Sequence, residues 1–175
     1  TSFSSLLQRR TLMFLDAIVR LYDYQREVNN HVLEVAERLS EDELTSIIIK
    51  GQPSIRDTLF HMIEVVESHF AYWSYSSDQR TPAFTERSSN EFSGARNLKD
   101  YWVTVDAHVA SCVASLSSDS DLERSYVRVF PDGGQNTRIL WEMLLHVINH
   151  GTQHRSEVAM MLTKLGHSPG DMEIL

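Results

Sequence analysis

The chain is poor in cysteine, and it has no long apolar run. Cys112 is the single cysteine among 175 residues, so no disulfide can form within the chain. We expect a reducing compartment, the cytoplasm. No segment approaches the roughly 20 apolar residues of a membrane span, and charged residues interrupt the apolar clusters near the N-terminus. We therefore expect neither a membrane partner nor an export signal.

Positive charge is also in short supply. Lys and Arg number 16 against 24 Asp and Glu, which gives a formal net charge of -8. Binding to a nucleic-acid backbone requires clustered Lys and Arg, so we exclude nucleic acid as a partner. Hydrophobic residues make up 42% of the chain and charged residues 23%, as in globular proteins. The length suits a single domain over residues 1–175.

Four stretches carry apolar residues at helical spacing. The predicted helices cover about residues 5–40, 54–76, 98–116 and 137–165. Ser40 with Glu43, and Ser54 with Asp57, follow the capping-box pattern that begins a helix. Four amphipathic helices without a convincing sheet predict an all-α four-helix bundle.

Two segments between the predicted helices need an explanation. Residues 76–97 are rich in Ser, Thr, Asn and Arg, and loops of this length are uncommon in compact domains. A long link can run back along a helix and begin the next helix parallel to it. Residues 124–130 alternate loosely, which predicts at most a short extended ribbon over the end of the bundle.

Three histidines recur at four-residue spacing in the segment LLHVINHGTQHR, residues 144–155. His146, His150 and His154 lie on one face of the last predicted helix. A tetrahedral ion holds imidazole nitrogens at about 2.0–2.1 Å, whereas His146 and His154 are separated by about 12 Å of helix rise. One ion can therefore bind His146 with His150, or His150 with His154.

A third ligand is expected from the second predicted helix. His61 and His69 are eight residues apart, so they are alternatives for the same reason. Periodicity slightly favours His69, which lies nearer the centre of the apolar stripe, and His31 and His108 are further candidates. Spacing alone leaves open a buried hydrogen-bonded ladder of histidines that binds no metal.

Several segments, taken in order, resemble the DinB/YfiT-like superfamily. The segment HVINHGTQHR (146–155) resembles the last helix of that family, and SIRDTLFHMIEVVESHFAYW (54–73) resembles its second helix. Residues 24–33, followed by LSEDEL, resemble the end of its first helix. The similarity extends from about Leu12 to Asp171. It implies a metal triad of His61, His150 and His154, and an up-down-down-up bundle with a long crossover between helices two and three.

The resemblance implies a metal-dependent enzyme, since the superfamily includes thiol-dependent S-transferases and isomerases and proteins labelled as hydrolases. Three neutral histidines leave one position open on a zinc-like ion. A divalent ion, most simply zinc or nickel, lowers the pKa of a bound water or low-molecular-weight thiol, which then attacks an electrophilic small molecule. The alternatives are a non-catalytic metal-binding stress-response protein and a plain bundle with polar histidines in its core.

Other residues are expected near the metal or the substrate, although none is assigned a catalytic role. Metal-bound histidine usually donates its second N–H to a carboxylate or carbonyl group. The candidates are Asn149, Arg155, His146 and His69, with Glu64 and Asp57 as further acceptors. For Arg155 the simpler expectation is a surface ion pair with Glu157 or Glu142. We also expect a small-molecule substrate and a homodimer.

Overall fold

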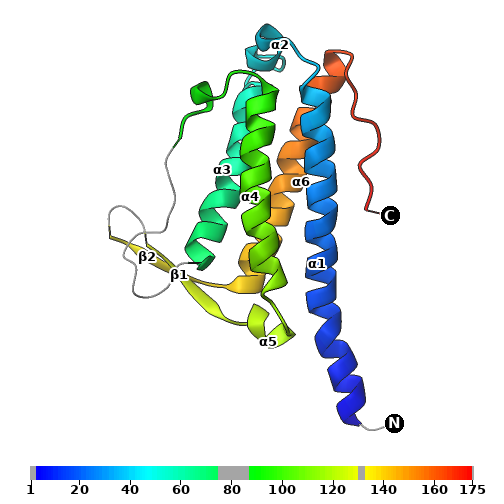
Figure 1. Ribbon diagram of the computed structural model, residues 1–175, viewed down its shortest axis with the longest axis vertical. Helices are drawn as coiled ribbons and strands as arrows, with labels where there is room; N and C mark the ends of the chain where they lie inside the picture. The colour runs from blue at the N-terminus through cyan, green and yellow to red at the C-terminus, as the bar shows by residue number, and fades with distance from the viewer. Residues whose placement is uncertain (1–2, 75–86, 130–132, 175) are drawn as a thin grey trace.

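The computed structural model describes residues 3–74, 87–129 and 133–174. Four long helices form a bundle, and they are α1 (Phe3–Ala36), α3 (Ile55–Ser74), α4 (Ala95–Ala114) and α6 (Leu140–Lys164). Figure 1 shows α1 and α6 running in one direction and α3 and α4 in the other. The predicted all-α four-helix bundle with up-down-down-up order is confirmed.

Short elements close the two ends of the bundle (Figure 1). At one end lie α2 (Glu41–Thr45) and the 3-10 helix η1 (Ser89–Glu91). At the other end lie α5 (Asp119–Leu122) and an antiparallel hairpin of β1 (Ser125–Val129) and β2 (Gln135–Ile139). The predicted extended ribbon is confirmed as β1. The predicted helix start at Thr137 is wrong, because residues 135–139 pair with β1 before α6 begins.

The predicted capping box is present at Ser40, and at the start of α3 the Ser54 hydroxyl accepts from the Asp57 backbone at 3.1 Å. The Ser40 hydroxyl accepts from the Glu43 backbone at 3.3 Å, and the Glu43 carboxylate accepts from the Ser40 backbone at 2.9 Å. Ser40 has an extended backbone with ψ at 162°. The first helix therefore ends at Ala36, earlier than predicted, and α2 starts afresh at Glu41.

The long link between α3 and α4 returns to the end of the bundle where α3 begins (Figure 1). The first part of this link, residues 75–86, lies outside the described residues. Its last part contains η1, where the Ser89 hydroxyl donates to Asp57 at 2.6 Å. Gly94, with φ at 81°, then begins α4 at Ala95, three residues before the predicted Leu98. Asp57 thus joins the start of α3 to the crossover link.

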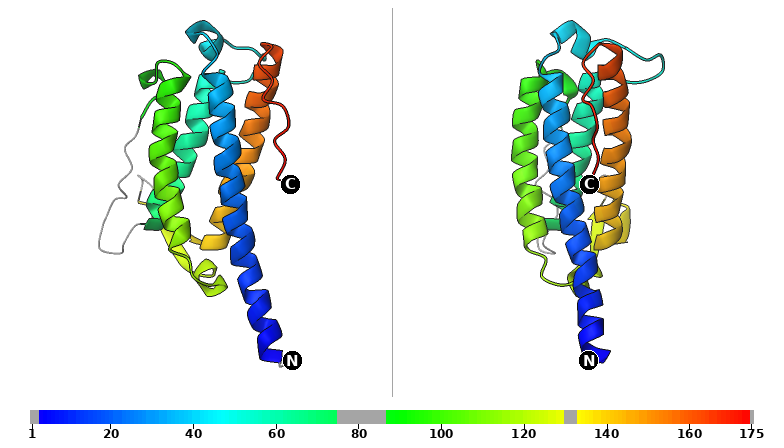
Figure 2. Two further views of the ribbon diagram at one scale, coloured as in Figure 1. Left: turned by 45° about the vertical axis from the view of Figure 1, so that its right-hand side comes forward. Right: turned by 90° about the vertical axis from the view of Figure 1, so that its right-hand side faces the viewer.

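One apolar core lies among the four helices. Its fully buried side chains include Ile18, Val32, Leu44, Ile55, Leu59, Phe70, Leu98, Leu122, Leu140, Leu144, Met161 and Leu162. The first turns of α1 project beyond the other helices (Figure 2). Over the described residues, none of the helices combines the length and the apolar character needed to cross a bilayer.

Candidate metal centre

Three histidines from two helices converge between α3 and α6. His61 of α3 and His150 and His154 of α6 each offer one ring nitrogen, and the three nitrogens lie within 4.8 Å of one another. The Nε2 atoms of His61 and His150 are 3.1 Å apart. Of the two pairs that helix rise left open on α6, the structure therefore places His150 and His154 beside His61.

The arrangement fits a tetrahedral ion with small side-chain adjustments. Imidazole nitrogens bound at about 2.0–2.1 Å to one ion lie within roughly 4 Å of each other. The ring centroids are 4.4 Å apart for His150 and His154, and 5.0 Å apart for His61 and His154. Rotation of the imidazoles about their side-chain bonds is enough to close the remaining difference.

Glu157 orients His154. The Nδ1 atom of His154 lies 2.6 Å from the Glu157 carboxylate, one helical turn further along α6. A carboxylate accepts, so Nδ1 carries the proton and Nε2 keeps its lone pair for a ligand. This imidazole–carboxylate pair is the usual support of a metal-binding histidine.

Burial, together with the neighbouring imidazoles, favours the neutral form of His150. Burial, reinforced by the neighbouring imidazoles of His154 and His61, lowers the pKa of His150 to about 4. Burial and His154 also lower the pKa of His61 from its ordinary value, against an opposing effect of Glu157. Only a neutral imidazole has a lone pair to donate to a metal, so both shifts favour metal binding at neutral pH.

The three histidines lack a fourth protein ligand among the described residues. His61 is exposed, and His150 and His154 are partly buried. Among the residues that the structure describes, no carboxylate or thiol joins the three histidines as a fourth ligand. These three histidines could hold an ion and would leave room in its coordination for a small molecule.

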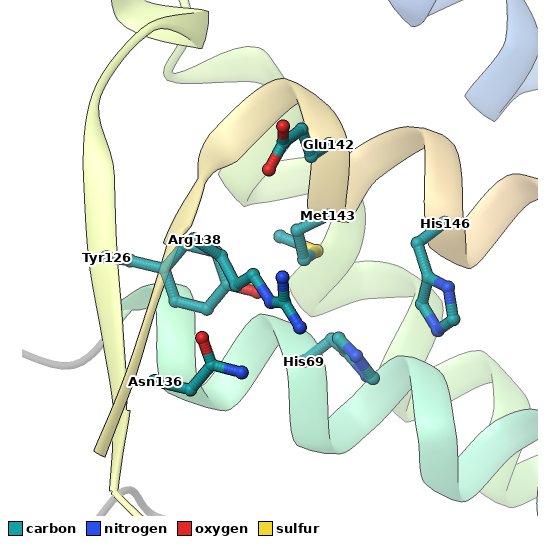
Figure 3. A pocket seen from close by; sticks show the side chains of 7 residues that line it. All are labelled: His69, Tyr126, Asn136, Arg138, Glu142, Met143 and His146. Atoms are coloured by element: carbon teal, nitrogen blue, oxygen red, sulfur yellow. The ribbon is translucent and has the colours of Figure 1, made fainter.

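His69 and His146 form a second pair beside the first cluster. Their ring centroids are 5.3 Å apart, and His146 lies 6.0 Å from His150. The Nδ1 atom of His69 donates to the Val65 carbonyl at 2.8 Å. Both histidines line a cavity of about 550 Å³ under the hairpin (Figure 3). His69 and His146 therefore lie next to the candidate metal centre, but they are not among its three converging histidines.

Arg155 faces the opposite side of α6, toward α1. It is 2% exposed, and its guanidinium donates to the Asn29 side chain at 3.0 Å and the Thr152 hydroxyl at 3.0 Å. The expectation of a surface ion pair for Arg155 is therefore wrong. Gly151 makes room for this contact, because a Cβ there would lie 2.7 Å from Nη1 of Arg155 and 2.8 Å from Oε1 of Gln25.

The remaining candidates lie elsewhere. Asn149 is exposed on α6, Glu64 is partly buried on α3, and Asp57 bonds to Ser54 and Ser89 at the start of α3. His31 contacts the Pro169 carbonyl at 2.7 Å, and His108 contacts Ser74 at 3.1 Å. The sequence reasoning missed Glu157 as a partner of His154, although a spacing of three residues on a helix indicates contact. It also missed Arg138 and Asn136 of the hairpin.

Comparisons with known proteins agree with this architecture. Residues 10–175 match the DinB family. A DinB-like protein from Bacillus cereus ATCC 10987 shares 17% identity, with 89% of this chain and 95% of that chain covered and a TM-score of 0.63. YfiT from Bacillus subtilis, described as "a probable metal-dependent hydrolase with an unusual four-helix bundle topology", shares 14% identity over 86% and 89% of the two chains, with a TM-score of 0.64.

A conserved protein from Enterococcus faecalis has the same fold at 11% identity, with 83% and 95% of the chains covered and a TM-score of 0.61. No curated protein sequence matches the chain. At these identities the solved structures show a shared fold, and the family match covers nearly the whole sequence. The chain belongs to the DinB family.

Proposed function

We propose that the chain is a metal-dependent enzyme in which His61, His150 and His154 hold one divalent ion, zinc or nickel. The convergence of three imidazole nitrogens within 4.8 Å, without a fourth protein ligand among the described residues, carries this proposal. Three histidines with one open position are the donor set of catalytic zinc sites, whereas structural sites are closed. A divalent ion bound there would lower the pKa of a water or a small thiol at the open position.

The chain's own residues bind and orient in this scheme. Glu157 fixes the tautomer of His154 through the 2.6 Å contact, and burial keeps His150 neutral. The cavity next to the cluster gives an electrophilic small molecule a place to bind. No side chain of the protein is required as the nucleophile.

Two nucleophiles are compatible with the same centre. The solved relative YfiT is described as a probable metal-dependent hydrolase, which supports attack by water. The resemblance to a superfamily with thiol S-transferases supports attack by a low-molecular-weight thiol. The competing function is a stress-response protein that binds the metal without catalysis.

Metal analysis of protein purified without an affinity tag tests the centre. We expect about one zinc or nickel ion per chain in the parent protein and in His69→Ala, and loss of the ion in His61→Ala and His150→Ala. His69→Ala is the matched control, because it removes an imidazole from α3, the helix of His61, that is not one of the three converging histidines. Loss of metal in His69→Ala alone would show that the triad is wrong.

Activity measurements then test the enzyme. The metal-loaded protein is incubated with activated esters and amides, and with alkylating electrophiles in the presence of cysteine or glutathione. We expect turnover by the parent protein in one of these groups, and none by His150→Ala. A protein that holds its metal but shows no turnover with water or thiols would support the non-catalytic alternative.

A further inference from the structure

The cavity beside the histidines is built from three parts of the fold. The hairpin contributes Tyr126, Asn136 and Arg138, α3 contributes His69, and α6 contributes Glu142, Met143 and His146. Its volume is about 550 Å³, which is the size of a small-molecule site. Figure 3 shows the Arg138 and Asn136 side chains reaching from the hairpin toward His69.

The Arg138 guanidinium has no partner among the described residues that line this cavity. Carboxylates outnumber cations in the chain by 24 to 16, and many of the described cations have paired with them, among them Arg26, Arg56, Arg96, Lys99 and Arg124. Within the described part of the chain, the Arg138 side chain has neither an ion pair nor a hydrogen bond, and Glu142 in the same lining does not pair with it. Its guanidinium donors are therefore available to a ligand.

We propose that this cavity binds the carboxylate of a small-molecule substrate through Arg138, with the electrophilic end of the same molecule at the metal centre. The planar guanidinium offers a fork of N–H donors that matches a carboxylate, and the nearby Asn136 amide adds a donor. The metal end of this proposal rests on the proposed function. The carboxylate end rests on the cavity alone.

A monoanion suits the lining better than a dianion such as a phosphate monoester. Among the described lining residues Arg138 is the one permanent cation, and Glu142 adds a negative charge to the same space. A single carboxylate is balanced by one guanidinium. A second negative charge would be repelled by Glu142 without a further cation to offset it.

The imidazoles link the cavity to the metal centre. The ring of His146 lies 5.3 Å from that of His69 and 6.0 Å from that of His150, so they form a continuous row. His61 and His69 are eight residues apart on α3, which corresponds to about 12 Å of helix rise. The substrate therefore spans on the order of 10 Å, or roughly eight bonds of an extended chain.

Thiols that carry a carboxylate at the far end test the proposal. The probes are mercaptoalkanoates of increasing chain length and mercaptoalcohols of the same lengths, bound to cobalt-loaded protein and followed by the sulfur-to-cobalt absorption band. We expect the carboxylate to bind about tenfold to a hundredfold more tightly than the alcohol at the best length. Arg138→Met abolishes this difference, whereas Arg38→Met, an exposed arginine just after the end of α1, preserves it.

The outcomes separate the two proposals. Equal binding of acids and alcohols to cobalt-loaded protein, or an unchanged preference in Arg138→Met, would overturn the carboxylate site and leave the metal centre intact. If the protein binds no cobalt, the metal centre fails, and the metal-free protein is titrated with hexanoate and hexanol. Shifts of the His69 and His146 imidazole resonances by hexanoate alone, lost in Arg138→Met, would still support the carboxylate site, and their absence would overturn it.

Discussion

The two polar faces of α6 differ in how their groups are satisfied. Toward α3, His150 and His154 turn ring nitrogens to a common point shared with His61. On the side that faces α1, the Arg155 guanidinium donates to Asn29 of α1 and to Thr152 of its own helix. His154 and Arg155 are neighbours in sequence, and the turn of about 100° per residue points them to different sides of the helix.

This difference separates a site from a structural contact. On the α1 side, the donors of a buried cation meet neutral oxygens of the protein, which is what a stable interface requires. On the α3 side, three imidazole nitrogens face one point, and no group among the described residues binds all three. Substitutions on the first face should therefore affect the free energy of unfolding, and those on the second should affect metal affinity.

Arg155→Met is expected to give the largest effect on stability. The change leaves the buried oxygen of Asn29 without its donor, so we expect the free energy of unfolding to fall by about 2–4 kcal/mol. Urea unfolding measures this change, with Arg38→Met as the exposed control that should shift stability by less than about 0.5 kcal/mol. Unchanged stability together with loss of metal would place Arg155 in the site and remove the contrast between the faces.

Glu157→Gln should weaken metal binding without unfolding the protein. The substitution removes the carboxylate charge that holds the His154 N–H, and loss of such a support typically lowers metal affinity about 10- to 100-fold. Competition with a chelator measures the affinity, and Glu27→Gln, an exposed position on α1, serves as the control. An affinity equal to that of the control would show that Glu157 does not support the centre.

Part of this site could be predicted from the sequence, because helix rise is a local property. Rise alone excluded His146 and His154 as ligands of one ion and left His150 common to both possible pairs. The choice between His61 and His69 depends on how far α3 is shifted along the bundle axis relative to α6. The segments that join the helices determine this shift, and they are distant in sequence from the histidines. Periodicity favoured His69, whereas the structure places His61 opposite His150 and His154.

The same limit applies to the hairpin and to Arg155. Residues 135–139 contain Gln, Asn and Arg, and they form a strand because β1 lies alongside, with Thr137 opposite Val127. Glutamates nearby in the sequence suggested a surface ion pair for Arg155, but neither Glu157 nor Glu142 lies three or four residues away, and packing against α1 buries Arg155 instead. The helices and caps follow from local patterns, while the cavity lining comes from contacts between distant segments.

Acid should destabilise the metal-free protein through the α3 face. The pKa of His150 is about 4 in the folded protein, lower than the ordinary value of about 6.5 that applies when the chain is unfolded. The unfolded chain therefore binds an additional proton between these values, and stability falls as the pH decreases from about 6.5 to 4. Burial lowers the pKa of Arg155 to about 10, so both states keep that proton below pH 7 and the α1 face contributes no slope.

Unfolding of His150→Ala and Arg155→Met across this range separates these contributions. We expect the metal-free His150→Ala protein to lose less stability on acidification than the parent protein. Arg155→Met should keep the parent's dependence on pH at a lower overall stability. The same slope in the parent protein and His150→Ala would show that His150 is not held neutral by the fold.

Gly151→Ala should give the smallest effect, and its sign tests how tightly the α1 face is closed. Alanine is favoured over glycine within a helix by about 1 kcal/mol, so an open position would be stabilised. At Gly151 the new Cβ would lie 2.7 Å from the Arg155 guanidinium and 2.8 Å from the Gln25 amide oxygen, and both groups must shift inside a buried contact. We expect these costs to exceed the helical gain, with a net loss of about 1 kcal/mol.

Asn149→Ala is the matched control for this glycine, because Asn149 is exposed on the same helix two residues earlier. It should gain a few tenths of a kcal/mol from helix propensity. In the Arg155→Met background the guanidinium is gone, and Gly151→Ala should cost less than it does in the parent protein. A gain in stability from Gly151→Ala in the parent would mean that Arg155 and Gln25 yield easily, and that the α1 face is less closed than its hydrogen bonds indicate.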